Sequence, residues 1–270
     1  MVQRSPVRFA HRLLRRGHGG ANDSLLNVML MVRVANQLAQ LEIFEEELPL
    51  RERILEFCKR QPTATLPIYP DGFFADHPEL AIIGSEFYLY RCHLGLGHYQ
   101  AADLLITHVE SEVLRAIRPK DPGVLGIRHC KAALNETLGR LEDARESLLQ
   151  IWQDYDELGL LHSPEGHNAT FGLLSVLHDL HDRERALQIA RKILAVNSDQ
   201  YGPDHRQTLE ALEMVANFLF LTENLSEALV VATSLSERRF RLVTEDGGAE
   251  DALRVQTTLE SIRAAIASST

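Results

Sequence analysis

The chain has 270 residues, with 38 acidic and 28 basic side chains and a formal net charge of −10 at pH 7. This acidic balance disfavours nucleic acid as the main partner, because phosphate binding needs a basic surface. The three cysteines, Cys58, Cys92 and Cys130, have no paired spacing and so indicate neither a disulfide framework nor a zinc site. No apolar run approaches the ~20 residues that a membrane span needs.

The first 20 residues form a basic arm with five arginines and no acid, which leaves −15 for the rest of the chain. Val7 to Leu14 fit one or two turns of an amphipathic helix. Three interpretations stay open: a tail that docks on the acidic body, a disordered arm that binds an acidic surface, and a mitochondrial transit peptide. We assign residues 1–22 to this arm and expect a cytoplasmic protein, with mitochondria as the alternative.

A first helical hairpin is predicted over residues 23–59, where Leu26, Leu30, Val34 and Leu38 form one apolar stripe. An irregular insert follows over residues 60–78, and its four prolines exclude helix over most of its length. The insert still carries the large apolar residues Ile68, Tyr69, Phe73 and Phe74. Such a segment either packs across the protein's own groove or contacts a partner, and both alternatives are kept.

An internal repeat of 42 residues runs through the rest of the chain. Ala102, Ala144, Ala186 and Ala228 stand one period apart, each five residues after a predicted turn and before further apolar residues. A small residue is needed at such a place because two helices cross closely there. Substituting glutamate for Ala144 or Ala186 should therefore destabilise the fold.

Helix starts recur with the same period. Asp121-Pro122 and Ser163-Pro164 each place an N-cap residue before a proline at the first helical position. Asn197 to Pro203 is predicted to be a turn-rich link. The repeat domain is predicted to span residues 23–270. It contains further hairpins at 79–119, 121–159, 163–196 and 203–243, and a capping helix at 249–268.

These patterns resemble tetratricopeptide repeats (TPRs), and GPDHRQTLE from Gly202 resembles the kinesin-light-chain type in particular. Leu38 to Leu55 matches the same turn pattern in degenerate form, with Phe44 in the aromatic place and Glu47 in the small-residue place. We expect Glu47 to be tolerated there because this first repeat is terminal or has a polar neighbour. The resemblance implies an all-α fold, a right-handed α-solenoid of about five TPR-like hairpins with a C-terminal capping helix. At least eleven helices and no strands are expected.

Sequence motifs for chemistry are lacking. There is no glycine-rich phosphate loop, nucleophile elbow or zinc-protease helix. His178 and His181 are three residues apart, but His181 lies in a predicted hairpin turn. We therefore expect no catalytic, metal-binding or cofactor-binding residues, no small-molecule substrate and no enzymatic activity.

The resemblance implies that the first helix of each hairpin lines a concave face that binds an extended peptide or a helix of one or more partner proteins. The expected partner-binding residues are those of the concave face and the insert: Asn36, Phe87, Arg91, His129, Phe171, Ser175, His178, Glu213, Asn217, Phe220, Ile68, Tyr69, Phe73 and Phe74. Two departures prevent carrying over a known ligand. Val32 stands where the chaperone-binding subgroup has lysine, and Met214 stands where the kinesin-light-chain type repeats asparagine.

The function predicted from the sequence is a non-catalytic protein–protein interaction module, either a scaffold or an architectural subunit of a larger assembly. The alternative is a nucleic-acid-associated helical repeat protein that uses the basic arm.

Overall fold

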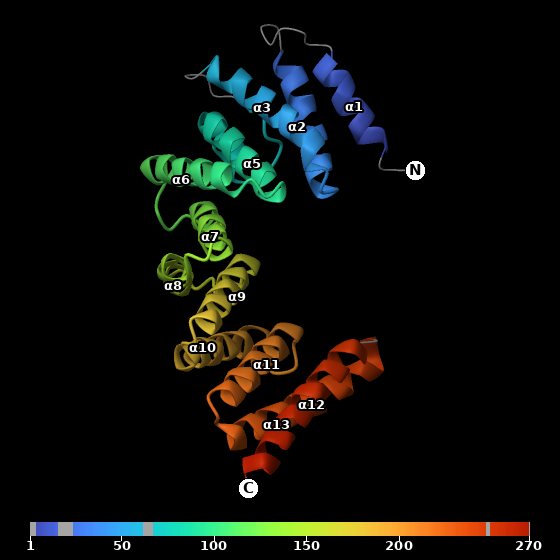
Figure 1. The fold of residues 1–270 in the computed structure, drawn as a ribbon, viewed down its shortest axis with the longest axis vertical. Helices are drawn as coiled ribbons and strands as arrows, with labels where there is room; N and C mark the ends of the chain where they lie inside the picture. The colour runs from blue at the N-terminus through green and yellow to red at the C-terminus, as the bar shows by residue number, and fades with distance from the viewer. Residues whose placement is uncertain (1–3, 16–23, 62–66, 247–248, 270) are drawn as a thin grey trace. The chain divides into compact units, whose positions relative to one another are not determined.

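The computed structural model describes residues 4–15, 24–61, 67–246 and 249–269. Within these ranges the chain forms thirteen α-helices, α1 to α13, and one short 3-10 helix, with no strand (Figure 1). The predicted all-α helical repeat fold is confirmed. None of the helices in the described part of the chain combines the length and apolar composition needed to cross a membrane.

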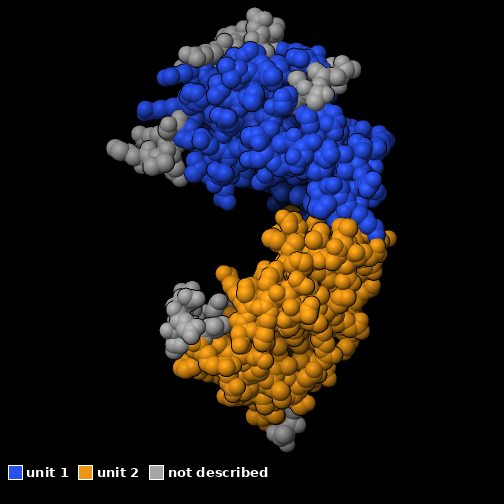
Figure 2. All heavy atoms as spheres, turned by 180° about the vertical axis from the view of Figure 1, so that it is seen from behind, with its two compact units in different colours: residues 1–134 blue, residues 135–270 orange. Residues whose placement is uncertain are grey.

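The chain divides into two compact units, Met1–Leu134 and Asn135–Thr270 (Figure 2). The boundary falls inside α7, which spans Pro122–Thr137. We call them unit 1 and unit 2 and describe each by itself.

Unit 1 contains two helical hairpins and the insert between them. Within the hairpins α2 packs on α3 and α5 packs on α6, while α3 also packs on α5. The helices are α1 (Arg4–Arg15), α2 (Leu25–Gln40), α3 (Phe44–Lys59), α4 (Phe73–Asp76), the 3-10 helix η1 (Pro78–Leu80), α5 (Ala81–Gly95) and α6 (Tyr99–Ala116).

Unit 2 continues the same scheme, each helix packing on the next from α8 to α13. The last helix buries Leu259 and Ile262, as the predicted capping helix requires. The helices are α8 (Leu141–Glu157), α9 (Pro164–Asp179), α10 (Arg183–Tyr201), α11 (Arg206–Leu221), α12 (Leu225–Asp246) and α13 (Ala249–Ser269).

The 42-residue period is visible in the backbone of the turns. Gly97, Gly139, His181 and Glu223 have φ values of 71°, 73°, 59° and 60°. A left-handed residue after the last helical turn lets the next N–H bond back to the helix, as Arg140 does to Asn135 O at 2.9 Å. The repeat is therefore built on one turn geometry, which glycine adopts freely and the other two residues adopt at some cost.

The small residues of the repeat lie where the second helix crosses its neighbours. Ala102, Ala144, Ala186 and Ala228 are all 0% exposed. A larger side chain at these positions has no space toward solvent, so the reason inferred from the sequence for a small residue holds in the structure.

The predicted link at Asn197 to Pro203 is wrong in its first part, because α10 continues to Tyr201 and ends at Gly202, with φ 87°. Asn197 is buried, and its amide nitrogen donates to the Gln207 carbonyl at 3.1 Å. A polar residue that suggested a turn is thus a tertiary hydrogen-bond partner on a helix.

The basic arm contains α1, which packs on α2 and α3 through the buried side chains of Ala10 and Leu13. Arg53 Nη1 donates to the Leu13 and Leu14 carbonyls at 3.3 and 3.1 Å, so a cation sits at the end of the helix where its dipole is negative. Residues 1–3 and 16–22 of the expected arm lie outside the described residues.

Candidate functional site: a groove between α9 and α11

The predicted concave-face residues fall into two sets, one in each unit. Unit 1 holds Asn36, Phe87, Arg91 and His129, and unit 2 holds Phe171, Ser175, His178, Glu213, Asn217 and Phe220. The side chains of the two sets differ in what they contact.

In unit 1 the insert packs against α5. Ile68, Tyr69 and Phe74 are buried, whereas Phe73 is half-buried. The Tyr69 ring stacks on Tyr88 at 5.0 Å between centroids, and Phe74 lies 5.6 Å from Phe87. The prediction that these side chains form an exposed partner surface is therefore corrected in favour of the self-packing alternative. Phe87, predicted to anchor a ligand, is half-buried and packs against the chain's own Phe74.

Two glycines allow the insert to approach this closely. A Cβ atom at Gly84 of α5 would lie 2.8 Å from Tyr69 and 2.9 Å from Phe74, and one at Gly123 of α7 would lie 2.1 Å from Phe73. Any side chain at either position would displace these rings. Glycine inside a helical pattern was thus a sequence signal for close packing that the sequence analysis did not use.

The Tyr69 hydroxyl is tied into the core of unit 1. It lies 2.7 Å from Ser85 Oγ, and Ser85 in turn donates to the Ala81 carbonyl at 2.8 Å. Burial raises the pKa of Tyr69 well above its ordinary value, which keeps the phenol protonated as a donor.

We expect Tyr69→Phe to lower the free energy of unfolding by about 1 kcal/mol, because one buried hydrogen bond is lost while the ring packing stays. Tyr88→Phe is the matched control, since Tyr88 is only half-buried and its ring contacts also remain. Urea denaturation followed by circular dichroism measures both. Equal losses in the two variants would contradict a role for the Tyr69–Ser85 bond.

Asn36 is also engaged inside unit 1. Its Oδ1 accepts from Arg51 Nη2 at 2.8 Å, and Arg51 Nε donates to Glu47 Oε1 at 2.7 Å. The Arg51 guanidinium lies 4.5 Å from the centre of the Tyr88 ring, a cation–π distance. Of the predicted unit 1 residues, Arg91 is exposed and His129 is half-buried.

Unit 2 has an open groove that is lined by residues of α9 and α11. Its volume is about 350 Å³, and the residues that line it are Phe171, Glu210, Glu213, Met214 and Asn217. Glu210, Glu213, Met214 and Asn217 share one face of α11 because they are three, four and seven residues apart. Phe171 lines the groove from α9 and is 46% exposed, so an aromatic ring is accessible there.

Three predicted residues, Phe171, Glu213 and Asn217, thus line one groove. Glu210 and Met214 were missed as site residues, although their spacing from Glu213 and Asn217 places them on the same helix face. The remaining predicted residues of unit 2 do not line the groove. Ser175 and His178 are exposed on α9, and Phe220 is half-buried on α11.

The two glutamates of the groove are held differently. Arg239 of α12 donates to Glu213 Oε2 at 2.6 Å, and both side chains are largely buried. Arg206 Nε donates to Glu210 Oε1 at 2.9 Å along the same helix, with the arginine side chain 84% and the glutamate 31% exposed. The first pair is part of the packing between α11 and α12, whereas the second is an exposed pair that contributes little to stability.

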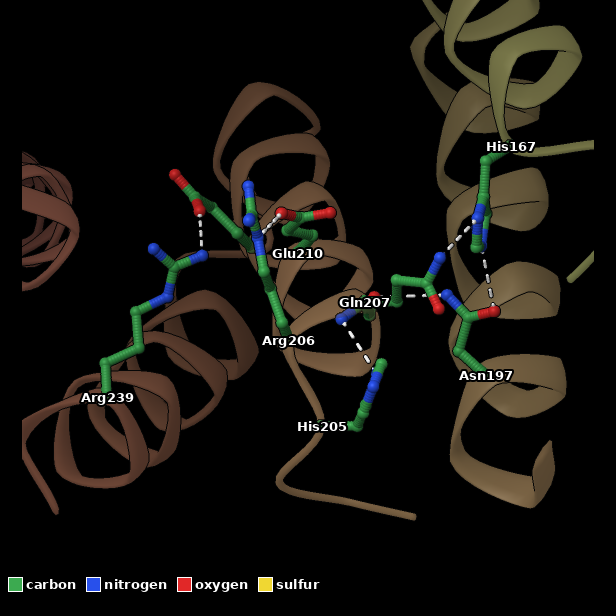
Figure 3. A network of polar contacts seen from close by, with 8 residues as sticks. His167, Asn197, His205, Arg206, Gln207, Glu210 and Arg239 are labelled. Carbon is green, nitrogen blue, oxygen red and sulfur yellow. Dashed lines mark hydrogen bonds and ion pairs between the residues drawn. The ribbon is translucent and has the colours of Figure 1, made fainter. Parts of the chain in front are cut away.

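A polar seam fixes the helices that carry the groove (Figure 3). His167 of α9 lies 3.1 Å from Asn197 Oδ1 through Nε2 and 3.1 Å from Gln207 Nε2 through Nδ1. Gln207 donates to Nδ1, so the second ring nitrogen carries the proton given to Asn197. These hydrogen bonds connect α9, α10 and α11, so they help to hold the two helices that line the groove, α9 and α11, in place.

The two units differ strongly in charge. Unit 2 has 23 Asp and Glu against 12 Lys and Arg, a formal charge of −11, whereas unit 1 has 15 against 16, a charge of +1. A third carboxylate of unit 2, that of Glu136 on α7, accepts from Ser175 Oγ at 2.7 Å. A ligand that approaches unit 2 therefore meets a negative field.

The described residues contain no group of three or more His, Cys, Asp or Glu side chains placed to hold a metal ion. His178 and His181 stand at the end of α9 and in the turn after it, both exposed. The groove combines two apolar side chains, two carboxylates and an amide, a set suited to holding a polypeptide segment.

No family model matches the chain, and no curated protein matches it in sequence. The structure is similar to the nearly identical TPR-like repeats of a candidate kinesin light chain from Podosopora anserina, with a TM-score of 0.67 and 16% identity over 83% of this chain and 100% of that one. It is also similar to BtubC (BKLC) from P. vanneervenii, with a TM-score of 0.62 and 17% identity over 83% and 84% of the two chains. A Rap protein complexed with competence and sporulation factor gives a TM-score of 0.51 and 11% identity over 99% and 72%.

These likenesses extend to the fold and stop there, because the identities are low. The chain therefore has the fold of TPR-like helical repeat proteins.

Proposed function

We propose that the protein is a non-catalytic protein-interaction module, and that it binds an extended segment of a partner protein in the groove between α9 and α11. The observation that carries the proposal is Phe171, an aromatic side chain left 46% exposed in a groove lined by carboxylates and an amide. Exposed aromatic anchors surrounded by polar groups dominate the energetics of protein interfaces.

The predicted site residues of unit 1 support this assignment by contrast. There the insert packs against Phe87, and Asn36 is bonded to Arg51. The groove of unit 2 has no such cover from the described residues of its own unit, so it is the better place for a partner. Scaffold and architectural roles both fit this arrangement.

Site-specific photo-crosslinking tests the proposal. Benzoylphenylalanine replaces Phe171 in one variant and Val230 in the other, since Val230 is 69% exposed on α12 of the same unit and does not line the groove. We expect a discrete crosslinked partner in cells from position 171 and not from position 230. Crosslinking of the same products from both positions, or none from position 171, would contradict binding in the groove.

A further inference from the structure

We infer that the segment bound in the α9–α11 groove carries a lysine or arginine beside a large apolar side chain. This inference rests on the proposed function and goes beyond it by assigning the chemistry of the occupant. It depends on three features of unit 2: the apolar pair in the groove, the accessible carboxylate of Glu210 and the charge around them.

The apolar half of the site is formed by Phe171 of α9 and Met214 of α11, which both line the groove. An aliphatic or aromatic side chain placed between them would remove apolar surface from water on both sides. Methionine is flexible and polarisable, so Met214 can adjust to side chains of different shape.

The charged half of the site is Glu210. Its ion-pair partner Arg206 is 84% exposed on the same helix, so the pair holds the carboxylate only weakly. A cation brought by a ligand can replace Arg206 and gain from the partly buried setting of the groove. Glu213 is not assigned this role, because the largely buried Arg239 already neutralises it at 2.6 Å.

Two arginines, Arg206 and Arg239, are each bonded to a carboxylate of the groove, and Glu136 adds a further acid beside Ser175. Together with the charge of −11 on unit 2, this arrangement attracts basic segments and repels acidic ones. Asn217, an exposed residue of the groove lining, has an amide that can donate to and accept from the backbone of such a segment.

A library of random short peptides, displayed on phage and selected at low ionic strength on the full-length protein, tests the inference. We expect the enriched peptides to share a lysine or arginine next to a large apolar residue. Synthetic versions are then measured by fluorescence anisotropy, with the basic residue kept or replaced by glutamine or glutamate.

Glu210→Lys should weaken binding of an enriched peptide by roughly tenfold or more, because an attractive contact becomes repulsive. Glu210→Gln should give a smaller loss. The matched control is Glu146→Lys, which makes the same change in net charge at an exposed position of α8 outside the groove. Circular dichroism of each variant confirms that it is folded.

Two results would overturn the inference in different ways. If the enriched peptides are acidic or uncharged but lose binding in Phe171→Ala, the ligand chemistry is wrong and the groove remains the binding site. If the enriched peptides bind Phe171→Ala and Asn217→Ala as well as the native protein, the proposed function fails together with the inference.

Discussion

Ala144→Glu and Ala186→Glu are each expected to lower the free energy of unfolding by about 3–5 kcal/mol, enough to unfold much of the protein at physiological temperature. Both alanines are 0% exposed at the crossing of the second helix of a hairpin with its neighbours. A glutamate there would place a carboxylate, which is larger and charged, in a packed interior. Thermal and urea denaturation followed by circular dichroism measure the loss.

Gln188→Glu is the control for charge alone. Gln188 lies two residues from Ala186 on the exposed face of α10, so the same new charge stays in water there. We expect a change within about 0.5 kcal/mol. If the alanine variants melt within error of the native protein, these alanines do not mark the close crossings of the repeat.

The repeat architecture could be predicted from the sequence because each 42-residue repeat uses the same local features. A turn residue at Gly97, Gly139, His181 or Glu223 and a small residue five positions later recur every 42 residues. Helix starts at Ser24 and Ser163 are marked by side chains that cap the first turn, accepting from Asn27 N and Gly166 N. Such signals lie within a few residues of the feature they specify, so one chain suffices to find them.

The course of the insert could not be predicted in the same way. Its composition indicated only that it is irregular and apolar, and both self-packing and partner contact fitted that composition. Self-packing is possible because Gly84 and Gly123 leave room for the aromatic rings of the insert, and these glycines lie up to about 50 residues away in the chain. Packing between segments distant in sequence is set by shape, which local patterns do not encode.

The candidate site was predictable in part. The resemblance to TPRs, counted back from the predicted turns, placed Phe171, Glu213 and Asn217 on the concave face, and all three line the groove. The difference between the units was not predicted, because it depends on where the insert packs and on how charge divides between residues 1–134 and 135–270. The net charge of the whole chain combines the almost neutral unit 1 with the strongly acidic unit 2, so it did not reveal the difference between them.

Glu47 shows how a local exception to the repeat can be stable. It occupies the small-residue place and is only 2% exposed. Arg51, one helical turn later, is 1% exposed. Burial raises the pKa of Glu47 above its ordinary value, while the charge and hydrogen bond of Arg51 act to lower it. Its tolerance thus comes from Arg51, since the place itself is neither terminal nor open to water.

The second large effect is therefore expected from Arg51→Met. This variant leaves Glu47 buried without its cation and also removes the bond to Asn36 and the contact with Tyr88. The free energy of unfolding should fall by about 3–5 kcal/mol, as for other buried ion pairs that lose one partner. Urea denaturation at neutral pH is the measurement.

The double variant Glu47→Ala, Arg51→Met should recover most of this loss. Alanine restores the residue type found at Ala102 and Ala144, and methionine fills much of the arginine volume with apolar atoms. Glu47 Oε2 and Arg51 Nη1 are buried without hydrogen-bond partners among the described residues, so removing both charges also removes two unsatisfied atoms. If the double variant is as unstable as Arg51→Met, the loss comes from packing and the pair is not its cause.

The pH dependence separates the same two causes. In Arg51→Met the folded state binds a proton at Glu47 more tightly than the unfolded state does, so stability falls as pH rises from about 4.5 through the raised pKa. The variant should therefore lose more stability at about pH 8 than at about pH 5, relative to the native protein. In the double variant that difference should vanish, because no carboxyl remains at position 47. A loss that is the same at both pH values in Arg51→Met would show that Glu47 is not left charged in the core.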